Sequence, residues 1–190
     1  MMDRRTFLSL TAALPATAAG SGPALAQLDT LTLKPIVKAV RDGDVDKVRS
    51  ALLKGESPNQ IDANGQPLLM IAVVSGHLPL AETLLKGGAV PDMQDKEGYT
   101  SLIRAAEQGD VDMVELLLSK RALPNAQTRQ GATALSIAAR RGYAEVVRAL
   151  LAKKADPNKA DFTGRTPMAY AKQSGRPAIE AMLRKAGGRE

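Results

Sequence analysis

Apolar residues recur along most of the chain in short segments with helical spacing, and the segments come in pairs. The pair between Gly98 and Lys120 shows this pattern clearly. Its apolar positions are Leu102, Ala105 and Ala106 in the first segment and Met113, Val114, Leu117 and Leu118 in the second. Spacings of three and four residues place such side chains on one face of a helix. The pattern predicts two short amphipathic helices, neither of which can bury its apolar face alone.

Polar residues and glycine between the segments predict where each helix begins and ends. Thr100 and Asp110 stand just before the first and second helix. A side-chain oxygen there can accept a backbone N–H of the first helical turn. Gly109 stands at the end of the first helix, where a left-handed backbone is common. Asp44 has the place of Asp110 in an earlier pair, so the same helix start is expected there.

Glycine and proline recur with one fixed period. Glycines fall at 65, 98, 131 and 164 and again at 43, 76, 109, 142 and 175, and prolines fall at 58, 91, 124 and 157. Each series steps by 33 residues, and three independent series with one period indicate a repeat array. Neighbouring units must stack to bury their apolar faces.

The opening of each unit identifies the kind of repeat. The related openings are Thr100-Ser101-Leu102, Thr133-Ala134-Leu135 and Thr166-Pro167-Met168. A unit of 33 residues with this opening resembles the ankyrin repeat, whose pattern there is Thr-Pro-Leu-His-x-Ala. The resemblance covers about residues 30–188 and implies an all-α solenoid of about five helix-turn-helix repeats. The repeats align at about 32–64, 65–97, 98–130, 131–163 and 164–190. The outer two are the most divergent and carry extra Lys and Arg, so we expect them to cap a monomer.

Two residues depart from the glycine that the ankyrin pattern has after the second helix. Gly55, Gly88 and Gly187 follow the pattern, whereas Arg121 and Lys154 do not. A left-handed backbone at these two positions would cost each of them about 1 kcal/mol.

Residues 1–26 have the features of an export signal. Arg4 and Arg5 precede an apolar stretch that is too short to span a bilayer, and Ala24 and Ala26 supply small residues before a cleavage site. The segment resembles a twin-arginine (Tat) signal, with an ordinary Sec signal as the alternative. We therefore expect cleavage after Ala26, a mature ankyrin-repeat domain of residues 27–190, and a location in a bacterial periplasm.

The composition narrows the chemistry that the chain can perform. It has no cysteine and one histidine, so disulfides, Cys/His zinc sites and thiol nucleophiles are excluded. His77 stands at the start of a second helix, where a structural role is expected. Asp62, Asp95 and Asp161 fall at one repeated turn position, which also favours a structural role. No glycine-rich phosphate loop occurs. The sequence predicts no catalytic residue, no metal site, no cofactor and no enzyme.

The remaining surface predicts a protein partner. The net charge is +6, but the Lys and Arg are scattered along the sequence and aromatics make up only 3%, which does not favour nucleic acid. The ankyrin resemblance implies contact through the turn tips and the inner helices. The predicted contact residues are Tyr99, Phe162, Arg140, Arg141, Arg165, Lys96, Arg129 and Gln66. Tyr and Arg are favoured interface anchors, and the arginines favour an acidic partner.

Three alternatives remain open at this stage. Phe162 could pack under its own loop, with the arginines merely solvated. The chain could be a secreted effector that acts on a host protein. It could also be an accessory subunit or minor hydrolase of the periplasm, which would require a pair of carboxylates in a groove, for instance around Glu107.

Overall fold

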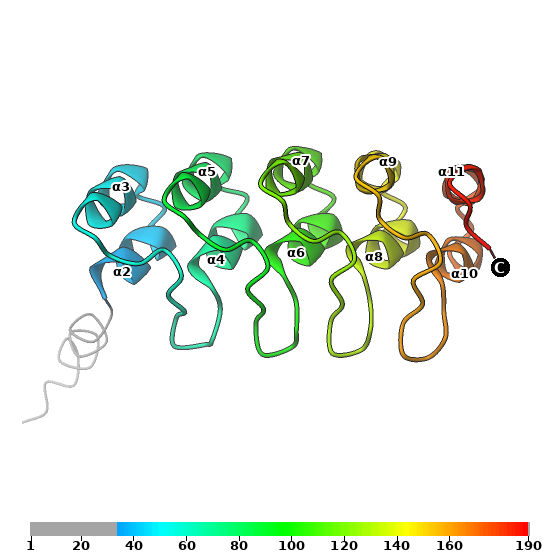
Figure 1. The fold of residues 1–190 in the computed structure, drawn as a ribbon, viewed down its shortest axis with the longest axis horizontal. Helices are drawn as coiled ribbons and strands as arrows, with labels where there is room; N and C mark the ends of the chain where they lie inside the picture. Colours follow the sequence, from blue (N-terminus) through cyan, green and yellow to red (C-terminus); the bar gives the residue numbers. More distant parts are fainter. Residues whose placement is uncertain (1–33, 190) are drawn as a thin grey trace, which may run out of the picture. The chain divides into compact units, whose positions relative to one another are not determined.

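A computed structural model describes residues 34–189, so the predicted export signal lies outside the described residues. Within this range the chain forms five pairs of helices in two layers (Figure 1). The inner helices are α2 (Pro35–Arg41), α4 (Leu68–Val74), α6 (Ser101–Gln108), α8 (Ala134–Arg141) and α10 (Pro167–Gln173). The outer helices are α3 (Val45–Leu53), α5 (Leu78–Lys86), α7 (Val111–Ser119), α9 (Ala144–Ala152) and α11 (Pro177–Lys185). The all-α solenoid of five repeats is confirmed.

The helices begin and end where the polar pattern predicts. The Thr100 hydroxyl accepts a backbone N–H of the first turn of α6 at 3.3 Å, and the Asp110 carboxylate does the same for α7 at 3.0 Å. Asp44 begins α3 in the same way. Gly109 ends α6 with φ of 77°. The left-handed backbone is also present at Arg121 and Lys154, with φ of 66° and 62°.

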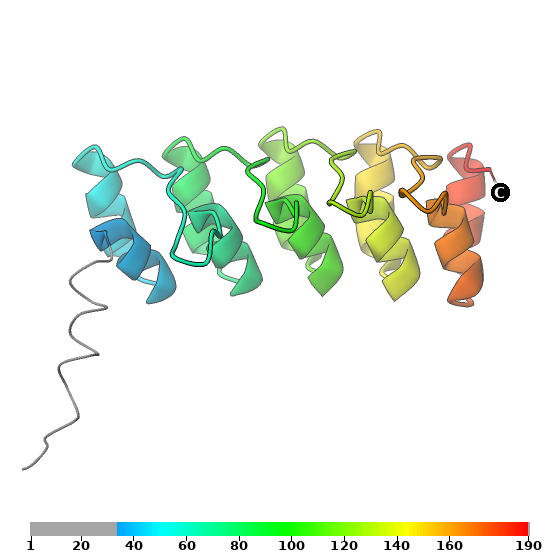
Figure 2. The ribbon, with the colours of Figure 1, turned by 90° about the horizontal axis from the view of Figure 1, so that it is seen from below.

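The apolar faces of the helices meet between the two layers and between repeats. All seven apolar residues that the sequence places on the two helices of the third repeat are buried. α8 packs on α6 and α10 in the inner layer and on α9 of its own repeat. Seen from the side of the tips, the helices of each layer lie side by side with nearly parallel axes (Figure 2). Burial of each helix therefore depends on the repeats on both sides.

A ladder of hydrogen bonds joins neighbouring repeats and explains why Asn or Asp follows each repeated proline. The side-chain oxygen of this residue accepts a backbone N–H from the return loop of the next repeat. The four bonds are Val90 to Asn59, Leu123 to Asp92, Asp156 to Asn125 at 2.8 Å, and Arg189 to Asn158 at 2.7 Å. Each side chain thus provides an acceptor for a return-loop N–H group, which lies outside the helices and has no partner within them.

Side chains at the start of the outer helices pack on the preceding repeat. The Tyr143 ring lies against Gly109 so closely that a Cβ there would be 2.9 Å from it. The His77 ring lies in the same way against Gly43. His77 precedes α5 without capping it by a side-chain hydrogen bond, so its structural role is packing.

Among the described helices, none has the length and apolar character needed to cross a membrane.

Candidate protein-binding face

The tips are the loops that project beyond the inner helices, and a buried side chain organises each of them. In the tip that leads into α6, one oxygen of Asp95 accepts the backbone N–H groups of Glu97 at 3.0 Å and Tyr99 at 2.8 Å. Asp62 and Asp161 make the same pair of bonds in their own tips. In the tip that leads into α8, the buried Thr128 replaces the aspartate, and its hydroxyl accepts two backbone N–H groups. The expected structural role of the repeated aspartates is confirmed.

The second carboxylate oxygen of each aspartate fastens the tip to an inner helix. Asp95 accepts a hydrogen bond from Arg104 of α6 at 2.7 Å, and Asp161 accepts one from Tyr170 of α10 at 2.5 Å. Both donors stand nine residues after their aspartate. In the fourth repeat the corresponding residue is the buried Ile137, which needs no charged partner. Asp62 has Ile71 at this position and instead accepts a hydrogen bond from Arg41 of the preceding inner helix α2, at 2.8 Å.

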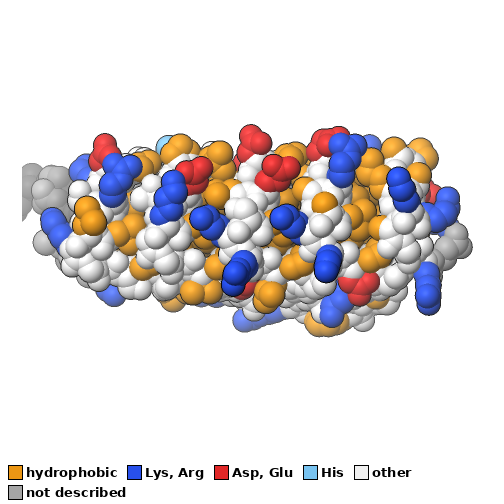
Figure 3. All heavy atoms as spheres, turned by 45° about the horizontal axis from the view of Figure 1, so that its top comes forward, with side chains coloured by type: hydrophobic (Ala, Val, Ile, Leu, Met, Phe, Trp, Pro, Cys, Tyr) orange, Lys and Arg blue, Asp and Glu red, His pale blue; other side chains and the backbone are white. Residues whose placement is uncertain are grey.

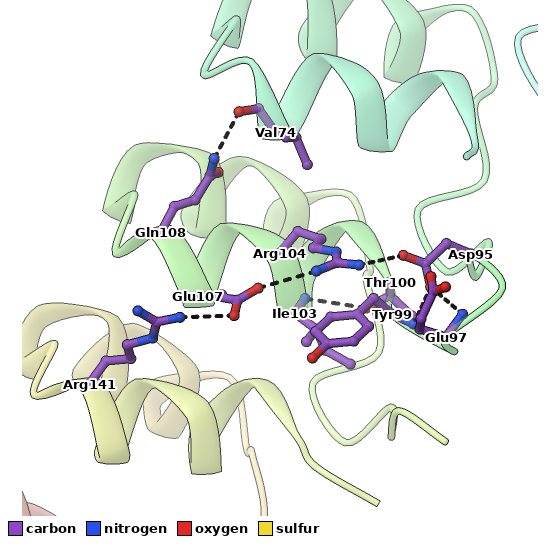
Figure 4. A network of polar contacts seen from close by, with 10 residues as sticks. All are labelled: Val74, Asp95, Glu97, Tyr99, Thr100, Ile103, Arg104, Glu107, Gln108 and Arg141. Carbon is purple, nitrogen blue, oxygen red and sulfur yellow. Dashed lines mark hydrogen bonds and ion pairs between the residues drawn. The ribbon is translucent and has the colours of Figure 1, made fainter. Parts of the chain in front are cut away.

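A chain of polar contacts runs along the inner layer from the third repeat to the fourth (Figure 4). The Arg104 guanidinium lies 3.6 Å from the centroid of the Tyr99 ring and contacts Glu107 at 3.3 Å as well as Asp95. Glu107 also binds Arg141 of α8 at 2.9 Å. Arg104 is thus held by two carboxylates and a ring, and the half-buried Tyr99 forms part of this rigid surface.

A second cluster joins the fourth and fifth repeats. The Arg140 guanidinium lies 5.7 Å from the centroid of the Tyr170 ring, and Arg140 is exposed. It forms no ion pair within residues 34–189. Burial raises the pKa of the Asp161 carboxyl, but hydrogen bonds from Tyr170, Thr163 and Arg165 outweigh burial and lower the pKa to about 2. The hydrogen bond that the Tyr170 hydroxyl donates to Asp161 raises the pKa of Tyr170.

These two clusters border a hollow of about 290 Å³ on the tip side of the inner helices. Its walls include Glu97 and Tyr99 from the tip that leads into α6 and Gln130 from the next tip. Arg140, Asp161 and Tyr170 complete them. A smaller hollow of about 220 Å³ lies one repeat earlier, beside Gln66, Arg104 and Glu107. The larger hollow offers two aromatic rings and an unpaired cation beside the carboxylates of Glu97 and Asp161, so it suits an apolar residue next to one carboxylate that meets Arg140.

Neighbouring tips are stacked on one another. The residue that follows the buried aspartate or threonine of a tip lies over the glycine of the preceding tip, which is Gly65 for Lys96, Gly98 for Arg129 and Gly131 for Phe162. A Cβ on Gly131 would lie 2.6 Å from the Phe162 backbone nitrogen. Phe162 nevertheless remains 72% exposed, so the alternative that it packs under its own loop is wrong.

The structure separates the predicted contact residues into four groups. Tyr99 and Arg140 border the larger hollow, Gln66 borders the smaller one, and Arg141 is tied to Glu107. Lys96, Arg129, Phe162 and Arg165 are exposed on the tips. Tyr99 is partly buried, because it packs against the hydrophobic core and Arg104 lies over its ring.

Sequence reasoning missed Tyr170 and Arg104, which shape the hollows as much as the predicted residues do. Both occupy the same register position of an inner helix, where two other repeats have Ile71 and Ile137. The signal was present in the sequence as a polar or aromatic residue nine positions after a tip aspartate. It could be interpreted only once the tip was known to bend back onto the helix.

The arrangement around Glu107 differs from what a hydrolase would need. Its carboxylate lies between Arg104 and Arg141, and no second carboxylate borders the smaller hollow among the described residues. Acid–base hydrolysis of glycosides uses two facing carboxyl groups. Within residues 34–189 no group of three His, Asp or Glu side chains is placed to hold a metal ion.

Comparison with known proteins agrees with the repeat architecture. A search of curated proteins found no match to the chain. The family model described as "Ankyrin repeats (3 copies)" matches the sequence over residues 36–128 and 120–189, which together span most of the chain. The chain therefore belongs to the ankyrin-repeat family.

Proposed function

We propose that the chain is an exported, periplasmic interaction module that binds an acidic segment of a partner protein. The partner would lie along the tips and over the larger hollow. Ankyrin repeats are protein-interaction modules, and the observation that carries the proposal for this face is Arg140. This cation is exposed without an ion pair in the described chain, beside two aromatic rings that are already held in place. A fixed ring and an unpaired guanidinium suit a carboxylate next to an apolar residue.

Replacement of Arg140 tests the binding face. Arg140→Ala removes a side chain that holds no other described residue by an ion pair, so the fold should be kept. Affinity capture of the partner from periplasmic extract, followed by titration of the captured protein, should show binding weakened by about tenfold or more. Arg148→Ala is the matched control, because it removes the same charge from outer helix α9. Equal affinity of the Arg140→Ala variant and the parent chain would refute the proposed face.

Tyr99 and Arg141 are tested together because each belongs to the network of the third repeat. Replacing both with alanine should weaken capture by about 2 kcal/mol or more if they are anchors. The free energy of unfolding must be measured in parallel, since Tyr99 also packs on the core.

Export is a separate part of the proposal and needs its own experiment. Arg4→Lys with Arg5→Lys keeps the charge but removes the guanidinium groups that distinguish a twin-arginine signal. Cell fractionation should find the parent in the periplasm and the double variant in the cytoplasm. If the double variant were found in the periplasm, the Sec route would be favoured. If the parent chain were found in the culture medium, a secreted effector would be favoured.

A further inference from the structure

We infer that the edge opposite the tips is a second binding surface, which docks onto an anionic lipid bilayer. The helices of the outer layer lie nearly parallel, and their return loops leave along one side of the molecule (Figure 2). Residues at the C-terminal ends of these helices therefore form one row. The central part of this row, here named the basic edge, consists of Lys54, Lys86, Lys120, Arg121, Lys153 and Lys154.

All six side chains of the basic edge are exposed. Lys86 is paired with Glu82 at 3.0 Å, whereas the other five form no ion pair in the described part of the chain. Arg184 and Lys185 extend the row into the last repeat. Space-filling atoms show Lys and Arg along the whole length of this face, with most Asp and Glu gathered along its upper border (Figure 3). The edge thus carries a linear excess of positive charge.

Three carboxylates occur in the adjoining return loops, but each is engaged by the backbone. Glu56 accepts the N–H of Ile36 at 3.3 Å, and Asp92 accepts that of Leu123 at 2.8 Å. Asp156 accepts a backbone N–H in its own loop at 2.8 Å. None of them forms an ion pair with a cation of the basic edge among residues 34–189.

Arg121 and Lys154 add an independent observation. They are the two described non-glycine residues with positive φ, at a register position where Gly55, Gly88 and Gly187 stand in the other repeats. The turn requires a left-handed backbone here in every repeat, and glycine would adopt it without strain. Here the strained residues are cations in the middle of the basic edge.

The occupant is identified by the apolar residues that accompany the cations. Leu53 is 83% exposed, Leu123 is 58% exposed and Val90 is 48% exposed, all beside the C-terminal ends of outer helices. A bilayer interface accepts apolar side chains while its anionic headgroups attract Lys and Arg. A nucleic acid would instead favour aromatic rings for stacking, and the described rings lie at the tips, on α10 and at the start of α9.

The decisive variant removes charge and strain together. It carries Lys120→Gln, Arg121→Gly, Lys153→Gln and Lys154→Gly, so it should be at least as stable as the parent chain. The matched control carries Arg129→Gln, Arg140→Gln, Arg141→Gln and Arg165→Gln, which removes the same charge from the tip side. Residues 1–33 are identical in all three full-length proteins, so any binding through them is shared.

Co-sedimentation with two kinds of vesicle tests the inference. Neutral vesicles consist of phosphatidylcholine alone, and anionic vesicles contain about 40% phosphatidylglycerol as well. The parent and the control should bind the anionic vesicles more tightly than the neutral ones, and 1 M salt (about 3 Å screening length) should release them. The edge variant should bind about 600-fold more weakly, since it lacks four cations and each cation near such a surface contributes about fivefold.

Three results of the vesicle experiment would overturn the inference. They are equal binding to neutral and anionic vesicles, an edge variant that binds as the parent does, and a control that loses as much binding as the edge variant. A duplex DNA bound as tightly as the anionic vesicles would also overturn it, in favour of nucleic acid. The outcome is independent of the partner-binding proposal, because loss of partner capture in the control variant leaves the vesicle result intact.

Discussion

Lys154 offers a direct test of how backbone strain limits the stability of this solenoid. Its φ of 62° lies in the left-handed region, and the structure gives its side chain no hydrogen bond or ion pair within residues 34–189. Lys154→Gly should therefore relieve about 1–2 kcal/mol of strain. Glycine also gains freedom in the unfolded chain, which offsets about 0.4–1 kcal/mol of this gain. The net stabilisation should be about 0.5–1 kcal/mol.

Thermal and guanidinium unfolding measure this effect. For a chain of this size, about 1 kcal/mol corresponds to a rise in melting temperature of about 2–4 °C. Lys154→Ala separates charge from backbone, because it removes the cation and keeps the Cβ; it should leave the stability nearly unchanged.

Gly88 supplies the reverse experiment at the same register position. Its φ is 89°, and a Cβ added there would meet no atom within 4 Å. Gly88→Lys should therefore lower the stability by about 1 kcal/mol through backbone strain alone. A Lys154→Gly variant that melts at or below the parent temperature, together with an unaffected Gly88→Lys variant, would refute the reasoning.

Three further predictions concern the contacts between repeats and within the tips. Asn125→Ala leaves a backbone N–H of the next repeat unsatisfied, so guanidinium unfolding should show a loss of about 1 kcal/mol. Gly131→Ala should lower the melting temperature more than Gly164→Ala does. Both glycines have a left-handed φ, but only at Gly131 would a Cβ meet Phe162. Equal melting temperatures of the two variants would contradict tip stacking. The Asp161 pKa of about 2 lies below the ordinary 3.8, so the ionised carboxylate stabilises the fold above about pH 4, and this contribution disappears as pH falls toward 2. Unfolding curves at several pH values should show a smaller change over this window for Asp161→Asn than for the parent.

The predictions that succeeded from sequence concern interactions within a few residues. Thr100 and Asp110 begin their helices because a side chain three residues from a backbone N–H needs no distant partner. Arg121 and Lys154 adopt left-handed backbones because the turn after an outer helix requires that conformation whatever residue stands there. Such local rules, repeated with a period of 33 residues, were sufficient for the fold.

The site could be predicted only in part because its decisive contacts join different repeats. Arg141 meets Glu107 across 34 residues, and Leu123 donates to Asp92 across 31. A shift of a few residues in the stacking would replace these pairs with others, and the sequence period alone does not specify that offset. The partial burial of Tyr99 could not be predicted for a related reason, since its cover by Arg104 depends on how the tip folds back onto α6.

The sequence by itself determined the repeat, its register, the helix ends and the strained turns, because these follow from local hydrogen bonding and steric preference. The tertiary structure alone decided which distant charges meet. Lys and Arg that are scattered along the sequence become a row, because equivalent ends of parallel helices are stacked side by side. Stacking of the repeats brings residues that are 33 positions apart in the sequence into one row. The basic edge and the hollow beside Arg140 therefore exist only in the folded chain.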